Sequence, residues 1–437
     1  MSELKNQGRP MNTTGGGVLL FSRQSLLTRP LHDWLGPVHT ANTVLLTTTS
    51  AIKDVAASTL RRYAHVEAVD DYHGWATELK AESLAKKFGV QRIASTSEMD
   101  VLRAARLRER LQLPGQSIWS ATAYRDKFIM RQVLREANIP VPNFSTLDDT
   151  CTLVSFFEQS PGPIVVKPRL GFASKAVSIL RDQQDLEEFL ASEKTSAVPF
   201  LPGQWMVEDY VAGVFHHVDG LMRNGEVLHC HPNRYSGGLI ERVRENSHLG
   251  SIMLDVDDPD AIVLRRLAQE TVAALPAAPD TLAFHLEAWI QPDGEAMVCE
   301  IASRAGGGPV VPGYEKSFGV HLARAGLLSQ YGDQIHAPRS DASPQPASAT
   351  LMFSGDGGVF DPPVGACPVA GADLTFSLRR GEQTARSGDS SSSVAIAMVT
   401  AENQSALILR LWELEQWWEN ESGHGYGQSI LGVSSDS

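Results

Sequence analysis

The sequence has few of the residues that mark disulfide-linked or zinc-binding proteins. Its four cysteines lie far apart in the chain and form no C-x-x-C pair. Cys230 stands between His229 and His231, but neighbouring residues on a strand point to opposite faces, so these side chains do not converge on one ion. We therefore expect inert thiols and no zinc site. The remaining cysteines are Cys151, Cys299 and Cys367.

Long apolar runs and clustered basic residues are also missing. No segment reaches the roughly 18 unbroken apolar residues of a membrane-spanning helix, and the polar first residues lack the apolar core of a signal peptide. The net charge of −13 argues against a nucleic-acid surface, although one local basic pocket suffices for a nucleotide. We expect a cytoplasmic protein that binds neither a membrane nor nucleic acid.

The chain has enough material for several packed cores. Its 437 residues fit two or three domains, and 42% hydrophobic with 20% charged residues is typical of a globular protein. The first 120 residues alternate β-type runs (17–21, 43–47) with helical patterns (74–88, 98–111), which predicts a parallel βαβ sheet. The glycines at 15–17 precede a strand rather than follow one, so we interpret them as a flexible lead-in and not as a dinucleotide fingerprint.

A second unit is expected over residues 121–210. Apolar residues on one face predict a helix over 126–137, and Pro140 and Pro142 then force the chain to extend. Two β-type runs, 164–167 and 176–180, are joined by a loop of small residues, and a further strand is expected over 204–211.

The third unit is expected over residues 211–437. It contains an Asn-Gly hairpin, a helix over 258–275 and a second hairpin, FHLEAWI with AMVCEIA. A Pro- and Ser-rich linker follows at 335–347. Beyond it we expect short strands (349–353, 393–399), an amphipathic helix (405–420), and a disordered tail after 421, so that a closing region starts after about 340.

Two acids stand out in the second hairpin. With a four-residue tip, Glu287 lies opposite Val298 or Glu300, and in either register Glu287 and Glu300 share one face. Such carboxylates repel unless a cation lies between them, and oxygen ligands of this kind suit Mg²⁺. Two solvated surface acids are the alternative, but both acids are embedded in apolar runs, where a lone charge is costly.

Lysines and small residues in the second unit suggest a phosphate site. Lys167 ends a β-type run and precedes a loop with Gly171 and Ser174, whose backbone N–H groups can approach phosphate oxygens. Lys127, at the start of the preceding helix, is a candidate for a second phosphate contact. The strand at 204–211 can supply an adenine slot, in which Glu208 or Asp209 accepts a hydrogen bond. Taken singly, either lysine is better explained as a surface charge.

The sequence resembles the ATP-grasp carboxylate-amine ligases in a set of motifs that occur in the same order. These motifs are D-K-x3-R-x7-I-P-V-P, V-V-K-P-x2-G-x-A-S, V-E-D-Y-V-x-G-x3-H-V-D-G, F-H-x-E and E-I-x-S-R-x-G-G-G. The sequence is most similar to the L-amino-acid ligase branch, which makes dipeptides and peptide-like antibiotics. The resemblance covers roughly residues 18–330. It implies the ATP-grasp fold of mixed α/β and α+β class: a Rossmann-like N-terminal domain, a central lid domain and a C-terminal domain with the metal site.

The resemblance also implies roles for individual residues. Phosphates would contact Lys127, Lys167 and the loop from Gly171 to Ser174, and adenine would lie at the hinge of Glu208, Asp209, Tyr210 and Val211. Magnesium would bind Glu287 and Glu300. Arg304 would hold the acyl phosphate, and His248 would lie near the phosphates, although a solvated loop histidine is an equal alternative. Glycines Gly306, Gly307 and Gly308 would leave the backbone accessible to a substrate.

The sequence departs from the family pattern at two positions. Ala302 replaces an asparagine that often binds a second magnesium, so water or Ser303 would have to take its place. Phe215 occupies the position of a glutamate that often contacts ribose. These departures motivate the alternative of a nucleotide-binding regulator without turnover.

The activity implied is ATP-dependent joining of a small carboxylic acid, such as an amino acid, to an amine through an acyl phosphate, with one or two Mg²⁺ ions or Mn²⁺ in their place. A carboxylase- or purine-pathway-type enzyme remains an alternative within the fold. The branch implies dipeptide or peptide-antibiotic synthesis, and such ligases are often homodimers. Basic residues in one loop suggest an acidic group on a substrate: Arg234, Arg242 and Arg244.

Overall fold

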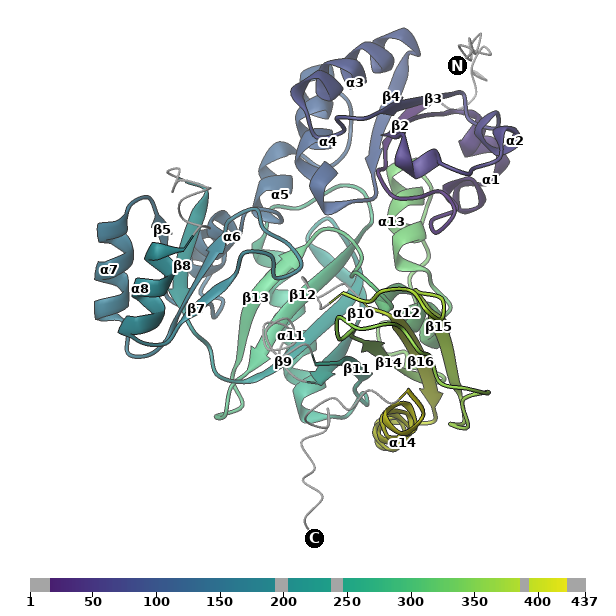
Figure 1. Ribbon diagram of the computed structural model, residues 1–437. Coiled ribbons are helices and arrows are strands. Elements are labelled where there is room, and N and C mark those ends of the chain that lie inside the picture. Colours follow the sequence, from purple (N-terminus) through teal and green to yellow (C-terminus); the bar gives the residue numbers. More distant parts are fainter. Residues whose placement is uncertain (1–15, 193–202, 237–246, 386–392, 423–437) are drawn as a thin grey trace.

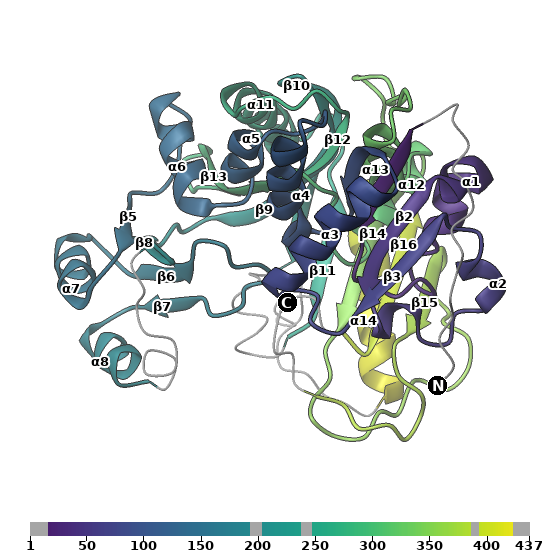
Figure 2. The same ribbon diagram turned by 90° about the horizontal axis from the view of Figure 1, so that it is seen from above.

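The computed structural model describes residues 16–192, 203–236, 247–385 and 393–422, which form three sheets with flanking helices (Figures 1 and 2). The predicted disordered tail after 421 falls almost wholly outside these residues, as does Gly15 of the glycine lead-in, whereas Gly17 begins the first strand. No helix among the described residues is long and apolar enough to cross a membrane.

The N-terminal sheet is parallel, with strand order β3-β2-β1-β4. Its residues alternate in direction, because Leu19 and Phe21 pack with side chains of α3 and α4, while Val18 and Leu20 pack with α1 and α13. The predicted βαβ arrangement is therefore confirmed. The elements are β1 (Gly17–Phe21), α1 (Leu31–Ala41), β2 (Thr43–Thr48), η1 (Ser50–Ile52), α2 (Ala57–Leu60), β3 (His65–Val69), α3 (Trp75–Lys87), β4 (Val90–Ser95), α4 (Glu98–Leu111) and α5 (Ile118–Ala123).

A second, smaller sheet is antiparallel in the order β5-β8-β6-β7, and α7 and α8 cover its outer face, at the left of Figure 1. The helix α6 begins at an N-cap, Asp126, whose carboxylate accepts hydrogen bonds from two backbone N–H groups. We refer to this unit as the lid. Its elements are α6 (Lys127–Glu136), β5 (Phe144–Leu147), α7 (Thr150–Gln159), β6 (Ile164–Pro168), β7 (Ser178–Leu180), α8 (Gln183–Ala191) and β8 (Trp205–Asp209).

The large sheet has eight antiparallel strands in the order β13-β12-β9-β10-β11-β14-β16-β15. On β12, Phe284, Leu286 and Ala288 join the core against α11, so the alternating residues His285 and Glu287 face the opposite side. Its elements are β9 (Val214–Arg223), β10 (Glu226–Ser236), β11 (Leu249–Met253), α11 (Pro259–Ala274), β12 (Leu282–Ile290), β13 (Ala296–Ala302), α12 (Val310–Phe318), α13 (Leu322–Gln330), β14 (Ala347–Phe353), β15 (Ala372–Phe376), β16 (Ala395–Ala401) and α14 (Gln404–Ser422).

The predicted linker at 335–347 contains no helix or strand before β14 begins at Ala347. The segments beyond it do not form a sheet of their own. Instead β14 pairs with β11 and carries β16 and β15 with it, and α14 packs on these strands through Leu407, Leu411 and Trp418. The C-terminal region is therefore part of the large sheet. Strand β15 and helices α12 and α13 were not expected from the sequence.

Candidate active site

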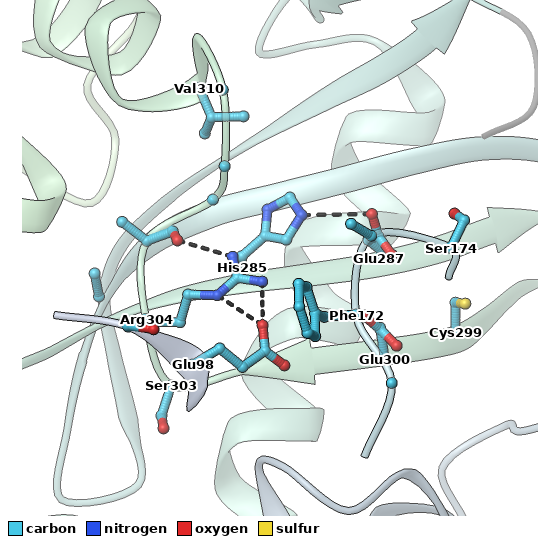
Figure 3. A pocket seen from close by; sticks show the side chains of 18 of the residues that line it. Glu98, Phe172, Ser174, His285, Glu287, Cys299, Glu300, Ser303, Arg304 and Val310 are labelled. Carbon is cyan, nitrogen blue, oxygen red and sulfur yellow. Dashed lines mark hydrogen bonds and ion pairs between the residues drawn. The ribbon is translucent and has the colours of Figure 1, made fainter. Parts of the chain in front are cut away.

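A cavity of about 600 Å³ lies where the three sheets meet, a volume suited to a small-molecule ligand. Figure 3 shows part of its lining, to which the N-terminal sheet, the lid and the large sheet all contribute. Most of the residues singled out in the sequence line it: Lys127, Lys167, Gly171, Ser174, Glu208, Asp209, Tyr210, Val211, Glu287, Glu300, Arg304, Gly306, Gly307 and Gly308.

The two hairpin acids lie directly opposite each other. Glu287 pairs with Glu300 across β12 and β13, and the register shifts by one residue between this pair and the next, leaving Cys299 as a bulge. The predicted four-residue tip is wrong, because Gln291 and Glu295 are joined by a backbone hydrogen bond and only three residues separate them. The bulge offsets the shorter turn and keeps both acids facing the cavity. They form an oxygen set of the kind that holds Mg²⁺.

Glu300 is held by a lysine from the lid. Lys127 Nζ lies 2.8 Å from Glu300 Oε2 and donates a hydrogen bond of 2.9 Å to the Gly171 carbonyl. Burial alone would raise the pKa of Glu300, but the charge of Lys127, supported by Lys167 and Arg304, lowers it to about 2. Glu300 is therefore ionised at neutral pH, as a metal ligand must be.

Lys167 reaches the cavity beside a buried ion pair. Its Nζ lies 2.5 Å from Glu208 Oε1, while Arg131 Nη2 lies 2.9 Å from Glu208 Oε2. Arg131 is fully buried and also donates to the Val298 carbonyl of β13 at 3.0 Å. The Glu208 carboxylate therefore contacts two cations, and its expected use as an acceptor for the adenine edge stays a prediction. Arg131 stands in the D-K-x3-R motif, but its role there was not recognised.

The loop after Lys167 has an unusual backbone. Ala173 and Ser174 have φ values of 53° and 56°, a left-handed backbone conformation that residues other than glycine rarely adopt. Arg125 Nη1 donates to the Gly171 carbonyl at 3.2 Å, so the start of this loop is held by both Arg125 and Lys127. Figure 3 shows Phe172 and Ser174 of this loop across from the hairpin acids.

Arg304 lies between the large sheet and the N-terminal sheet. Its guanidinium makes two hydrogen bonds to Glu98 Oε2, one of them from Nε at 2.9 Å, and Nη1 donates to the Ala305 carbonyl (Figure 3). Glu98 is the first residue of α4 and also lies 3.7 Å from Arg125. Although burial opposes its ionisation, these two arginines lower the pKa of Glu98. Glu98 therefore fixes the arginine head group at the cavity wall.

Two histidines and one aspartate form a buried hydrogen-bonded group on the same face of the sheet. His217 Nδ1 and His285 Nδ1 contact the two carboxylate oxygens of Asp219 at 2.5 and 2.9 Å. His285 Nε2 lies 3.4 Å from Glu287 Oε1. Burial opposes protonation of His285, but Asp219 raises its pKa to about 10. A protonated His285 can therefore hold the Glu287 carboxylate in position through the ion pair at Nε2.

Among the described residues, the three ligand atoms of His217, Asp219 and His285 also lie close enough, within 4.8 Å, to hold a metal ion. The hydrogen bonds of Asp219 to both rings already account for the cluster. The group was missed in the sequence because its members come from two strands. The spacings H-x-D at 217–219 and H-x-E at 285–287, which place each pair on one strand face, were the available signal.

The three glycines after Arg304 differ from one another. A Cβ on Gly306 would lie 2.8 Å from Asp219 Oδ1 and 2.9 Å from His285 Nδ1, so a side chain does not fit there. A Cβ on Gly307 would meet nothing within 4 Å, and Gly308 has a φ of 54°. Gly306 is thus required for packing on the histidine group, and Gly307 is the position with open space before it.

Two predicted residues do not line the cavity. His248 is buried, its ring lies edge-on to Phe353 at a centroid distance of 4.9 Å, and its Nδ1 accepts a hydrogen bond from the Ser354 N–H at 3.3 Å. Arg234 lies near His216 and Asp260, on the other face of the sheet from its cavity-lining neighbour Tyr235. The expectation that Arg234 meets a substrate is wrong, and Arg242 and Arg244 fall outside the described residues.

The two sequence departures can also be placed. Phe215 lines the cavity, stacks on Tyr235 at a centroid distance of 5.5 Å and lies tilted against Trp289 at 5.4 Å, so it presents an aromatic surface. Ala302 is buried opposite His285. The neighbouring Ser303 Oγ accepts a hydrogen bond from Gln116 Nε2 at 3.2 Å, which leaves it oriented by protein rather than free to turn.

Residues 124–308 match the ATP-grasp domain family. This part of the chain is an ATP-grasp domain. The matched segment begins just before the lid helix and ends at the last of the three glycines, so it carries Lys127, Lys167, Glu208, Glu287 and Glu300 but not Glu98. The N-terminal sheet and the strands after 308 lie outside it.

Proteins similar to the chain include two ligases. An L-arginine-specific L-amino acid ligase of Bacillus subtilis is 27% identical over 249 residues, covering 55% of this chain and 58% of the relative. An alanine–anticapsin ligase of Bacillus subtilis is 24% identical over 289 residues, covering 60% of this chain and 59% of the relative. The similarity therefore spans less than two thirds of these relatives.

Solved structures with the ATP-grasp domain show that the fold extends over nearly the whole chain. An L-amino acid ligase from Bacillus licheniformis superimposes with a TM-score of 0.68 at 15% identity, covering 92% of this chain and 98% of that chain. A carboxyaminoimidazole ribonucleotide synthase from Aspergillus clavatus gives 0.66 at 16% identity, covering 93% and 99%. These likenesses show the ATP-grasp fold.

Proposed function

We propose that the protein joins the carboxylate of a small acid to an amine, with ATP converted to ADP and phosphate. The observation that carries this proposal is one cavity of an ATP-grasp domain that holds Glu287 opposite Glu300, two lysines and Arg304. Similarity to L-amino acid ligases supports an amino acid as the acid and a dipeptide as the product. Similarity to an alanine–anticapsin ligase supports a setting in peptide-antibiotic assembly.

The reaction would proceed through an acyl phosphate. A carboxylate oxygen attacks the γ-phosphorus, and the bond to the β-phosphate oxygen breaks to release ADP. The amine nitrogen then attacks the acyl carbon, phosphate leaves, and the amine loses a proton. Lys127 and Lys167 would contact the phosphates, and Arg304, fixed by Glu98, would stabilise the oxyanion that forms at the acyl carbon.

Glu287 and Glu300 fit a divalent cation by their charge and their position. Glu300 is ionised, the two carboxylates face the same cavity from paired positions, and oxygen ligands suit Mg²⁺ and also Mn²⁺. When bound, the ion would neutralise charge on the transferred phosphoryl group. Lys127 contacts Glu300 directly, so lysine, acid and cation would share the charge of the nucleotide at one point.

The test is turnover with ATP, Mg²⁺ and pairs of amino acids, read as nucleotide product, phosphate and the mass of any new amide. We expect ADP, phosphate and amide in equal amounts. AMP would contradict the acyl-phosphate route, and turnover that needs only bicarbonate would favour a carboxylase. Nucleotide binding without turnover on any acid would favour the regulator.

A matched pair of variants tests the assignment of the metal acid. Glu300→Gln keeps the shape of the side chain but removes its charge, and we expect turnover to fall by a factor on the order of 10³ with the thermal midpoint retained. Glu295→Gln, at the exposed hairpin turn, should retain full turnover. A fully active Glu300→Gln variant would remove Glu300 from the metal site.

A further inference from the structure

The N-terminal sheet offers a second wall to the cavity at its topological switch point. Strands β1, β2 and β3 follow one another to one side, whereas β4 returns to the other side of β1. The segments that leave β1 and β4 therefore diverge, and the crevice at the carboxyl ends of such strands is where open parallel sheets bind ligands. Arg23 and Arg29, after β1, and Thr96 to Glu98, after β4, line the cavity at this point.

Two arginines of this crevice lack an acidic partner. Among the described residues, no carboxylate oxygen lies within 4.0 Å of the guanidinium of Arg23 or of Arg29. Arg29 Nη1 donates only one long hydrogen bond, 3.5 Å, to the Thr96 carbonyl, and Arg23 Nε is buried without a hydrogen-bond partner in the same part of the chain. A partly buried cation without an anion is unfavourable, so this arrangement fits an anionic ligand group.

The surrounding charges point the same way. Arg304 is close enough to Arg29 to add to the effect of burial in lowering the pKa of Arg29. Glu98 is already shared by Arg304 and Arg125. Asp100 is close enough to Arg23 for their charges to interact, but the two side chains make no ion pair within the described part of the chain. The crevice therefore has a surplus of positive charge that its own acids do not offset.

We propose that Arg29, supported by Arg23, binds the free carboxylate of the amine-bearing substrate, so that this substrate is an amino acid rather than a simple amine. The proposal rests on the ligase function proposed above. The carboxylate that becomes the acyl phosphate is consumed beside Arg304. A second carboxylate, which stays intact in the product, is the group that the guanidinium of Arg29, without an acidic partner of its own in the described ranges, would select.

The experiment compares each accepted amine substrate as the free amino acid and as its C-terminal amide, with ATP and the acid substrate saturating. For the native protein we expect kcat/KM at least about tenfold higher for the free acid, the effect of one charge-assisted hydrogen-bonded pair. In Arg29→Gln we expect KM for the amino acid to rise about tenfold or more, with kcat and the KM for ATP changed less than about threefold. Discrimination between acid and amide should then disappear.

Arg29→Lys and Arg61→Gln complete the design. Arg29→Lys keeps the charge but not the fork of donors, so it should show an intermediate KM and keep part of the preference for the acid; it also carries the test if Arg29→Gln does not fold. Arg61 is an exposed arginine at the end of α2, and Arg61→Gln should match the native protein.

Four results would overturn the proposal. An equal kcat/KM for acids and amides in the native protein would remove the carboxylate subsite, while amide formation would still support the ligase. An unchanged KM and preference in Arg29→Gln would remove Arg29. A preference for O-phosphoethanolamine over every amino acid would show that the site binds a phosphate group rather than a carboxylate. If Arg29→Gln loses the preference for the free amino acid only when the acid substrate is aspartate or glutamate, Arg29 would bind the side-chain carboxylate of that acid substrate. If no pair gives an amide, the proposed function fails as well.

Discussion

The buried contact of Glu208 with Arg131 and Lys167 allows a quantitative prediction for Glu208→Gln. The native carboxylate neutralises two buried cations at 2.9 and 2.5 Å. With an effective dielectric constant of about 20, one such pair attracts by about 6 kcal/mol before the cost of desolvation. A glutamine leaves both cations buried without an anion, and removing one partner of a buried pair costs about 3–5 kcal/mol. With an unfolding entropy of about 2.1 cal/mol/K per residue over the whole chain, we expect the thermal midpoint to fall by roughly 3–5 °C.

The measurement is thermal unfolding followed by circular dichroism, with Glu187→Gln as the matched control. Glu187 is exposed on α8 of the same lid, so its variant should unfold within about 1 °C of the native protein. A shift of less than about 2 °C for Glu208→Gln would show that the ion pairs contribute little and refute the reasoning.

The pH dependence gives a second reading of the same contact. Burial alone would raise the pKa of Glu208, but Arg131 and Lys167 hold it below the ordinary value of 4.5. A carboxylate with a lowered pKa adds stability that is fully present above pH 4.5 and is lost as the pH falls through its folded-state pKa. The native midpoint should therefore fall more steeply below pH 4.5 than that of Glu208→Gln, and parallel curves would contradict this.

Two further predictions concern the cavity wall. Gly306→Ala should lower the thermal midpoint by several degrees, an overpacking cost of about 1–3 kcal/mol against the aspartate and histidine behind it, whereas Gly307→Ala should leave the midpoint unchanged; equal midpoints would place open space at both positions. Burial raises the pKa of Cys299 to about 12, so little of this thiol is ionised at pH 8. Iodoacetamide at that pH should alkylate exposed Cys151 at least about 100-fold faster than Cys299, as followed by peptide mass spectrometry. Comparable rates for the two cysteines would show Cys299 to be a reactive thiol.

The sequence predicts well where contacts depend on periodicity. Glu287 and Glu300 share a face because side chains alternate on paired strands, and this holds in either register, so the error in the hairpin turn did not affect it. Helix α4 was predicted by its apolar spacing. The parallel sheet follows from the alternation of strand and helix patterns.

Contacts between distant elements were not predicted. Glu208 belongs to β8 and Arg131 to α6, and their buried ion pair forms only when these two elements pack together. Arg29 comes within electrostatic range of Arg304 across 275 positions in the chain, and no local pattern indicates this proximity. His248 has the sequence neighbours of a site residue, but its ring packs on Phe353 instead. Side-chain partners of this kind follow from tertiary packing, which propensity and spacing do not encode.

The pairing of β14 with β11 has a consequence for shortened versions of the chain. The matched domain ends at residue 308, but the sheet that carries Glu287 and Glu300 continues through strands contributed from residue 347 onward. A version that stops at the Pro- and Ser-rich linker would leave the backbone donors and acceptors of β11 unpaired along an open edge, and such edges recruit strands from other molecules. The boundary suggested by sequence similarity is therefore a poor place to cut this protein, because the fragment would be prone to self-association even though it keeps Lys127, Lys167, Glu287, Glu300 and Arg304.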